Sequence, residues 1–84
     1  MRIIDGKYQT SGDITKLDGT PVPENEPLIL FRAQDVLLQP LLDHYKAICA
    51  AAGCSELQLD LITKRIAVIE EWQQKNMGRL KVPD

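Results

Sequence analysis

The amino-acid sequence predicts an α+β fold, in which a small N-terminal antiparallel β-hairpin or meander of two or three short strands packs on an antiparallel two-helix hairpin. Turn-forming residues are concentrated in the first third of the chain, and two amphipathic helical patterns fill most of the remainder. Only a very short connection separates these two patterns. Because so short a connection reverses the chain, the two helices are expected to run antiparallel.

A length of 84 residues predicts one domain, 1–84, near the lower limit for a self-sufficient core. We divide it into a β-rich segment (1–34), a first helix (35–53), a second helix (55–76) and a tail (77–84). The net charge of −2 lacks the basic excess of proteins that neutralise nucleic-acid phosphates, so we expect no nucleic-acid partner. No apolar run has the length of a membrane span, which predicts a cytoplasmic protein without a membrane partner.

The β-rich segment is punctuated by turns. Asp5-Gly6 is a hairpin signal between Arg2–Ile4 and Lys7–Thr10. Three prolines within residues 21–27 predict an extended connector, because proline cannot donate to a strand ladder. The apolar run Leu28–Phe31 is expected to complete the sheet.

The first helix is expected to begin with Asp35 as N-cap, or alternatively with Pro40 as its first helical residue. Gly53 supplies the left-handed residue that ends it. At about 100° per residue, its apolar side chains share one arc. They are Leu37, Leu38, Leu41, Leu42, Tyr45, Ile48, Cys49 and Ala52.

The second helix opens with a capping box, in which Ser55 is the N-cap and Gln58 stands at the third helical position. Its apolar residues form two stripes rather than one. The first comprises Leu59, Ile62, Ile66 and Ile69, and the second comprises Leu57, Leu61, Val68 and Trp72. Together they cover about 200°, which is more than one packed face requires. We therefore expect a homo-oligomer, with a dimer as the first expectation, and take the second stripe as its interface. Trp72 is either a core residue or an anchor of that interface.

Two arginines allow two interpretations each. Arg65 lies between the two stripes. Its side chain either extends to solvent or forms a salt bridge to a carboxylate such as Asp60 or Glu70 of another subunit, or it binds an anion in an interface groove. Arg32 precedes the first helix, where it either pairs with a nearby carboxylate or joins the helix N-terminus in binding an anion. Lys7 and Tyr8, on the predicted hairpin, are the remaining candidate ligand contacts.

The sequence contains no motif of a known catalytic or cofactor site. It has no glycine-rich phosphate loop, and neither Cys49, Cys54 nor the single His44 has the companions that a metal site needs. We expect a non-enzymatic protein without a metal or another cofactor, in which both cysteines are reduced thiols.

The central part of the chain resembles a family of small bacteriophage proteins. The resemblance is carried by Gly19-Thr20-Pro21-Val22-Pro23-Glu24-Asn25-Glu26-Pro27, the apolar run after it, and Arg32-Ala33-Gln34-Asp35. The family pattern is Gly-x-Pro-Ile-Pro-Glu-Asp-Glu-Pro, an apolar strand and Arg-Ala-x-Asp, so this chain departs from it at Val22 and Asn25. No catalytic residue carries over from that family.

The resemblance implies a phage-encoded protein in the cytoplasm of a bacterial host. We expect a small binding protein, first as an anti-defence oligomer that sequesters an anionic nucleotide-derived signal through Arg32, Arg65, Lys7 and Tyr8. The alternative is a protein–protein interaction module that inhibits or adapts a host or phage protein. In that case the second apolar stripe and Trp72 form the contact surface.

Overall fold

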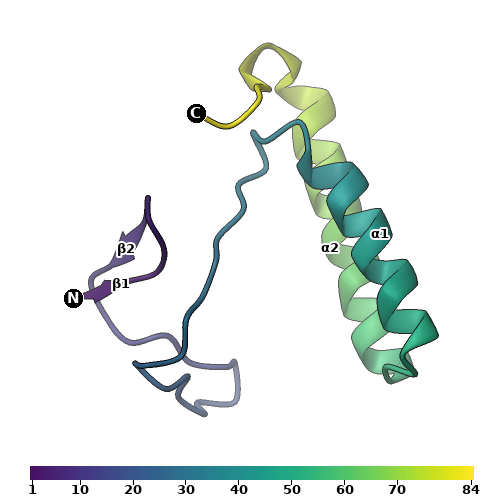
Figure 1. The fold of residues 1–84 in the computed structure, drawn as a ribbon. Helices are drawn as coiled ribbons and strands as arrows, with labels where there is room; N and C mark the ends of the chain where they lie inside the picture. Colours follow the sequence, from purple (N-terminus) through teal and green to yellow (C-terminus); the bar gives the residue numbers. More distant parts are fainter. The chain divides into compact units, whose positions relative to one another are not determined.

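The computed structural model describes all 84 residues and confirms the α+β class. The chain forms two compact units, residues 1–30 and residues 31–84 (Figure 1). The first contains the strands β1 (Arg2–Ile3) and β2 (Gln9–Thr10). The second contains the helices α1 (Leu38–Ala51) and α2 (Glu56–Lys75) and the short 3₁₀ helix η1 (Met77–Arg79). The packing of the β segment on the helices stays a prediction.

The predicted N-terminal hairpin is present as an antiparallel pair in which Arg2 lies opposite Thr10 and Ile3 opposite Gln9. The connection is longer than the two-residue turn that Asp5-Gly6 favours. A type I′ turn needs positive φ at both central residues, whereas only Gly19 and Gly53 have positive φ in this chain. The loop instead closes through a hydrogen bond of 2.8 Å from the Ile4 N–H to the Tyr8 carbonyl.

The proline-rich connector is held by the Arg2 guanidinium, which is only 8% exposed. It donates to the carbonyl oxygens of Val22, Pro23 and Glu26 at 3.2, 2.9 and 3.0 Å. These contacts satisfy carbonyl groups that have no strand partner. Residues 28–31 do not form the predicted strand, because they are not paired with another strand.

Helix α1 begins at Leu38, later than the predicted Asp35. Pro40 explains the delay, because a proline ring clashes with the carbonyl four residues earlier and is tolerated only in the first turn of a helix. The predicted end is confirmed. Gly53 has φ 81°, its N–H donates to the Ala50 carbonyl at 3.2 Å, and the Cys54 N–H donates to the Cys49 carbonyl at 3.0 Å. These two bonds are those of a Schellman motif.

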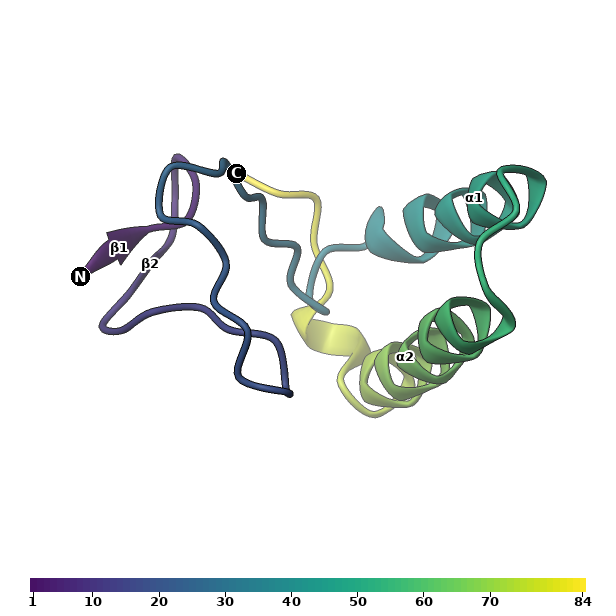
Figure 2. The same ribbon diagram turned by 90° about the horizontal axis from the view of Figure 1, so that it is seen from below.

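Helix α2 begins as predicted, with the Ser55 hydroxyl accepting the Gln58 N–H at 3.1 Å. It runs antiparallel to α1 (Figures 1 and 2). Cys49, Ile62 and Ile66 form the core between the helices. The half-buried Leu42, Cys54 and Leu59 pack against this core, and Leu38 is also buried. The first stripe of α2 is thus the one that faces α1.

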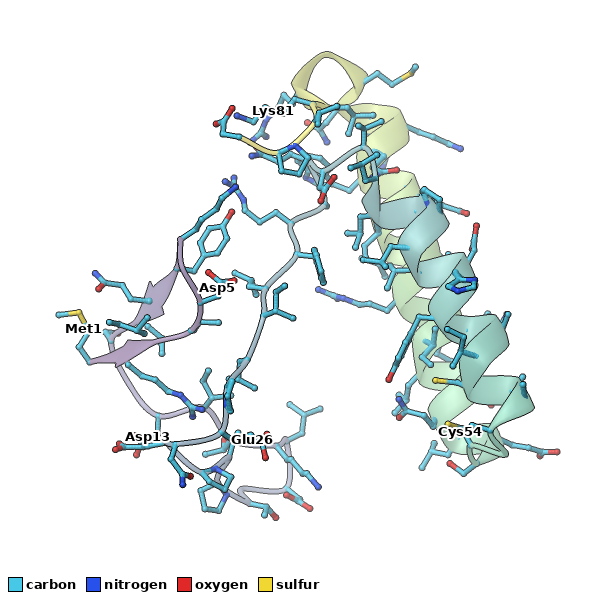
Figure 3. The ribbon with its side chains drawn as sticks, in the orientation of Figure 1. Met1, Asp5, Asp13, Glu26, Cys54 and Lys81 are labelled. Atoms are coloured by element: carbon cyan, nitrogen blue, oxygen red, sulfur yellow. The ribbon has the colours of Figure 1, made fainter.

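The tail returns to the residues that lead into α1. The Lys81 N–H donates to the Gln34 carbonyl and the Val36 N–H donates to the Lys81 carbonyl, both at 3.0 Å, so that Asp35 and Lys81 form a parallel bridge. Figure 3 shows Lys81 beside this segment. Residues 77–84, the predicted tail, thereby close the open end of the helical hairpin.

Removal of residues 81–84 is expected to destabilise the helical hairpin. Two backbone hydrogen bonds are lost, each contributing about 0.5–1.5 kcal/mol. The free energy of unfolding, measured by urea titration with circular dichroism, should therefore fall by about 1–3 kcal/mol. Removal of residues 83 and 84 alone retains both bonds and is the matched control. Equal stability of the two truncated chains would contradict the closing role of Lys81.

Candidate functional site

The second stripe of α2 is exposed along most of its length. Leu57, Leu61 and Val68 are 70%, 54% and 53% exposed, whereas Trp72 is half-buried. The Arg79 guanidinium lies 5.1 Å from the centre of the Trp72 ring, at a distance typical of a cation–π contact. Trp72 is therefore neither a fully buried core residue nor a free anchor.

Helix α1 carries an exposed stripe of its own. Leu37, just before the helix, and Leu41, Tyr45 and Ile48 within it are between 41% and 53% exposed. Their spacing of four, four and three residues places them on one side of the helix. The predicted apolar arc of α1 is therefore divided, because only part of it faces α2.

These two stripes lie on the same side of the hairpin. On the opposite side, the Gln39 amide donates a hydrogen bond to the Glu70 carboxylate across the two helices. At about 100° per residue, Gln39 and Glu70 each lie roughly opposite the exposed stripe of their own helix. Both stripes consequently face away from that contact. We call the combined surface the apolar face, and it consists of Leu37, Leu41, Tyr45, Ile48, Leu57, Leu61, Val68 and Trp72.

Arg65 lies within the apolar face. At about 100° per residue, the stripe from Leu57 to Trp72 covers about 60° of α2. Arg65 lies about 20° beyond Trp72, on the side nearer the contact with α1 and thus between the two exposed stripes. The side chain is exposed and makes no ion pair with the rest of the chain. The salt bridge predicted for Arg65, to Asp60 or Glu70 of another subunit, stays a prediction. An unpaired guanidinium among apolar side chains remains available for a ligand or partner.

The carboxylates of the two helices lie outside the arcs of the apolar face. They belong to Asp43 of α1 and to Glu56, Asp60, Glu70 and Glu71 of α2. Glu71 is paired with Lys75 at 2.8 Å. The apolar face thus presents one central cation and no anion.

Most of the N–H groups at the beginning of α1 are occupied, and the Gln39 N–H is the exception. The Leu37 N–H donates to the Asp35 carboxylate at 2.8 Å, and the Leu38 N–H donates to the Asp35 carbonyl at 3.1 Å. The Val36 N–H is bonded to Lys81, and Pro40 has no N–H to offer. The anion site predicted here from Arg32 and the helix N-terminus therefore retains only the Gln39 N–H as a backbone donor, and it stays a prediction. The exposed Arg32 side chain stays a predicted ligand contact.

The four predicted ligand contacts are divided between the two units. Lys7 and Tyr8 belong to residues 1–30, and Arg32 and Arg65 belong to residues 31–84. Ala33, next to Arg32, is hydrogen-bonded to Gln73, which lies about 12 Å along α2 from Arg65. The structure therefore does not bring the backbones of the two arginines together.

Sequence analysis missed the role of Gln73. The Gln73 side-chain amide donates to the carbonyl oxygens of Ala33 and Asp35 at 3.0 and 3.4 Å. It also lines an open hollow of about 390 Å³ together with Gln39, Glu70, Gln74, Met77 and Leu80. The backbone carbonyl groups just before α1 require hydrogen-bond donors, and this requirement was the signal that could have indicated a structural role for Gln73.

The two cysteines lie where the helices are connected, as the label of Cys54 in Figure 3 shows, and both are free thiols. A hydrogen bond with the Cys49 thiol, followed by burial, raises the pKa of Cys54. A hydrogen bond with the same thiol raises the pKa of Tyr45. The raised pKa of Cys54 favours its protonated, unreactive form, so this thiol does not have the character of a nucleophile.

No group of three or more His, Cys, Asp or Glu side chains could hold a metal ion, and no helix is long and apolar enough to cross a membrane. In comparisons with known proteins, no family model, no curated protein and no solved structure matches this chain. The resemblance to the phage family therefore stays a prediction.

The loop that carries Lys7 and Tyr8 is organised by Asp5. Its carboxylate accepts the N–H groups of Lys7, Tyr8 and Leu30 at 2.8, 3.0 and 3.0 Å. The bond from Lys7, followed by that from Leu30, holds the pKa of Asp5 below its ordinary value.

Acidification is expected to loosen the loop. Because the pKa is lower in the folded state than in the unfolded state, ionised Asp5 stabilises the loop fully above its ordinary pKa of about 4. That contribution is lost as the pH falls through the lowered folded-state pKa. The amide proton shifts of Lys7, Tyr8 and Leu30, followed by NMR from about pH 6 to 2, should share a midpoint below about 3.9.

The Asp5→Asn variant should remove this shared titration. The Asp18→Asn variant is the control, because Asp18 accepts the Thr20 N–H, at 2.9 Å, and none of these three amides. Its loss should leave the three amide titrations unchanged. A shared midpoint at or above the ordinary pKa of aspartate would contradict the assignment.

Proposed function

We propose that this chain is a non-enzymatic protein–protein interaction module whose helical hairpin binds its partner through the apolar face. The observation that carries this proposal is the placement of two exposed apolar stripes on one side of the hairpin. An apolar surface of this extent on a small chain is typical of an interaction site. The half-buried Trp72, next to Arg79, is of a residue type that is enriched at the centres of interfaces.

The partner is a host or phage protein if the family resemblance holds, and a second copy of this chain is the other candidate. Self-association, with a dimer as the first expectation, would use Leu57, Leu61, Val68 and Trp72 as the sequence predicts. Both candidates cover the same apolar surface. Light scattering of the purified chain separates them, because only self-association raises the molar mass of the protein in isolation.

Leu61→Asp is expected to abolish partner binding, whether the partner is a second copy or another protein. A carboxylate at an exposed position leaves the core intact but cannot be buried at an apolar interface without a large penalty. Capture from a bacterial lysate, followed by titration with the purified captured protein, should show at least about a hundredfold weaker binding. The dimer, if one forms, should dissociate.

Asp60→Ser is the matched control, because it changes a neighbouring exposed residue outside the apolar face. Circular dichroism checks that both variants keep their helices. Binding or dimerisation that survives Leu61→Asp unchanged would overturn the proposed function.

Sequestration of an anionic nucleotide-derived signal is the second candidate function. The observation that favours it is the unpaired Arg65 among apolar side chains, since a guanidinium beside apolar groups suits a phosphate joined to a flat base. Arg32 is a second exposed arginine in the same unit.

Under this candidate function, cyclic nucleotides or ADP-ribose derivatives should bind in calorimetry and raise the melting temperature. Arg65→Ala and Arg32→Ala should each weaken that binding by about tenfold or more, which is the effect of losing a charge-assisted hydrogen bond. Absence of a binding signal with all of these compounds would exclude the candidate, as would arginine variants that bind unchanged.

A further inference from the structure

The charge pattern of the apolar face specifies the chemistry of its partner. We infer that the apolar face accepts an amphipathic helix of another protein that carries a carboxylate within its apolar stripe, placed to pair with Arg65. This inference rests on the proposed function, because it names the partner of the same surface.

The first argument is shape. Two antiparallel helices in contact present a shallow groove between their side-chain rows, and a third helix can pack along it with its own row of apolar residues. The apolar face has one such row on each helix. The rows run from Leu37 to Ile48 and from Leu57 to Trp72, so they follow most of the length of the hairpin.

The second argument is charge complementarity. Arg65 is the only charged residue of α2 that lies between its two stripes, on the side of the exposed stripe nearer to α1, and it has no ion pair. A partner helix that covers the stripe removes water from the guanidinium. That loss of hydration is strongly unfavourable unless the partner supplies an acceptor for its N–H groups, and a carboxylate matches them in a bidentate geometry.

The same argument disfavours a second copy as the occupant. A second copy presents an identical surface, with its own Arg65 and with no carboxylate within the arcs of the apolar face. Self-pairing would place both guanidinium groups in the contact without a counter-charge. A heterologous acidic helix satisfies the group that a homodimer leaves unpaired.

The test uses three synthetic helical peptides of about 20 residues that share one leucine stripe and differ only at its middle position, where they carry Glu, Gln or Lys. Binding to the full chain is measured by fluorescence anisotropy at low and high salt. The Glu peptide should bind at least about tenfold more tightly than the Lys peptide, with Gln between them, because close charge pairs at interfaces couple at this level or above. High salt should reduce the difference.

Arg65→Glu should reverse the order, so that the Lys peptide binds best. Lys46→Glu is the matched control, since Lys46 lies on α1 outside the arc of the apolar face, and it should leave the order unchanged. Equal affinities for the three peptides, an order that survives Arg65→Glu, or no binding of any peptide would each overturn the inference.

The outcomes separate the inference from the proposed function. If Leu61→Asp abolishes partner binding but Arg65→Glu leaves it unchanged, the proposed interaction module is supported and the acidic partner is contradicted. A stable homodimer that buries Arg65 would lead to the same conclusion. Partner binding that is unchanged in Leu61→Asp would contradict both the proposed function and the inference.

Discussion

Two helices that pack side by side can bury only one stripe of each other, and this constraint decides what the helical unit presents to its surroundings. The core between α1 and α2 uses Cys49, Ile62 and Ile66, with Leu38 buried nearby. Helix α1 has a broad apolar arc and α2 has two stripes, so the contact cannot cover all of their apolar residues. The remainder gathers on one side because the two helices run antiparallel and the leftover stripes flank the same edge of their contact. The apolar face is thus a consequence of patterning in the sequence combined with the geometry of a two-helix contact.

Backbone groups that lack a regular partner explain the less regular parts of the chain. In residues 1–30, prolines remove donors from the connector, and Arg2 supplies three N–H bonds to its carbonyl groups. Before α1, Gln73 and Lys81 perform the same task for residues 33–36. The Arg-Ala-Gln-Asp segment that carries the phage resemblance therefore has a structural role in this fold: its carbonyl groups and the Asp35 carboxylate fix the entry into α1 and hold the tail.

The sequence predicted those features that local chemistry decides. The Ser55 cap, the Gly53 stop and the stripe that includes Ile62 each depend on a few neighbouring residues, and the structure confirms all three. The predicted start of α1 was wrong because Asp35 and Pro40 give competing signals. The proline excludes a helix through Val36 and Leu37. The strand at residues 28–31 was wrong because apolar character does not supply a pairing partner. Arg2 and Gln73 could not be assigned, since their acceptors lie 20 or more residues away in the sequence. The exposed side of the α1 arc was likewise not predicted, because it depends on how the two helices meet.

Arg65 shows how one polar residue can make an apolar surface selective. Leucine and valine side chains bind many apolar partners with little discrimination, because burial depends on area and not on direction. A guanidinium within the same surface changes this, since every partner that covers it must either supply an acceptor or leave a buried charge unpaired. The penalty applies to all partners that place no carboxylate against Arg65, so it acts mainly by excluding wrong partners. The same feature that weakens the apolar face as a general hydrophobic surface therefore gives it a means of recognition.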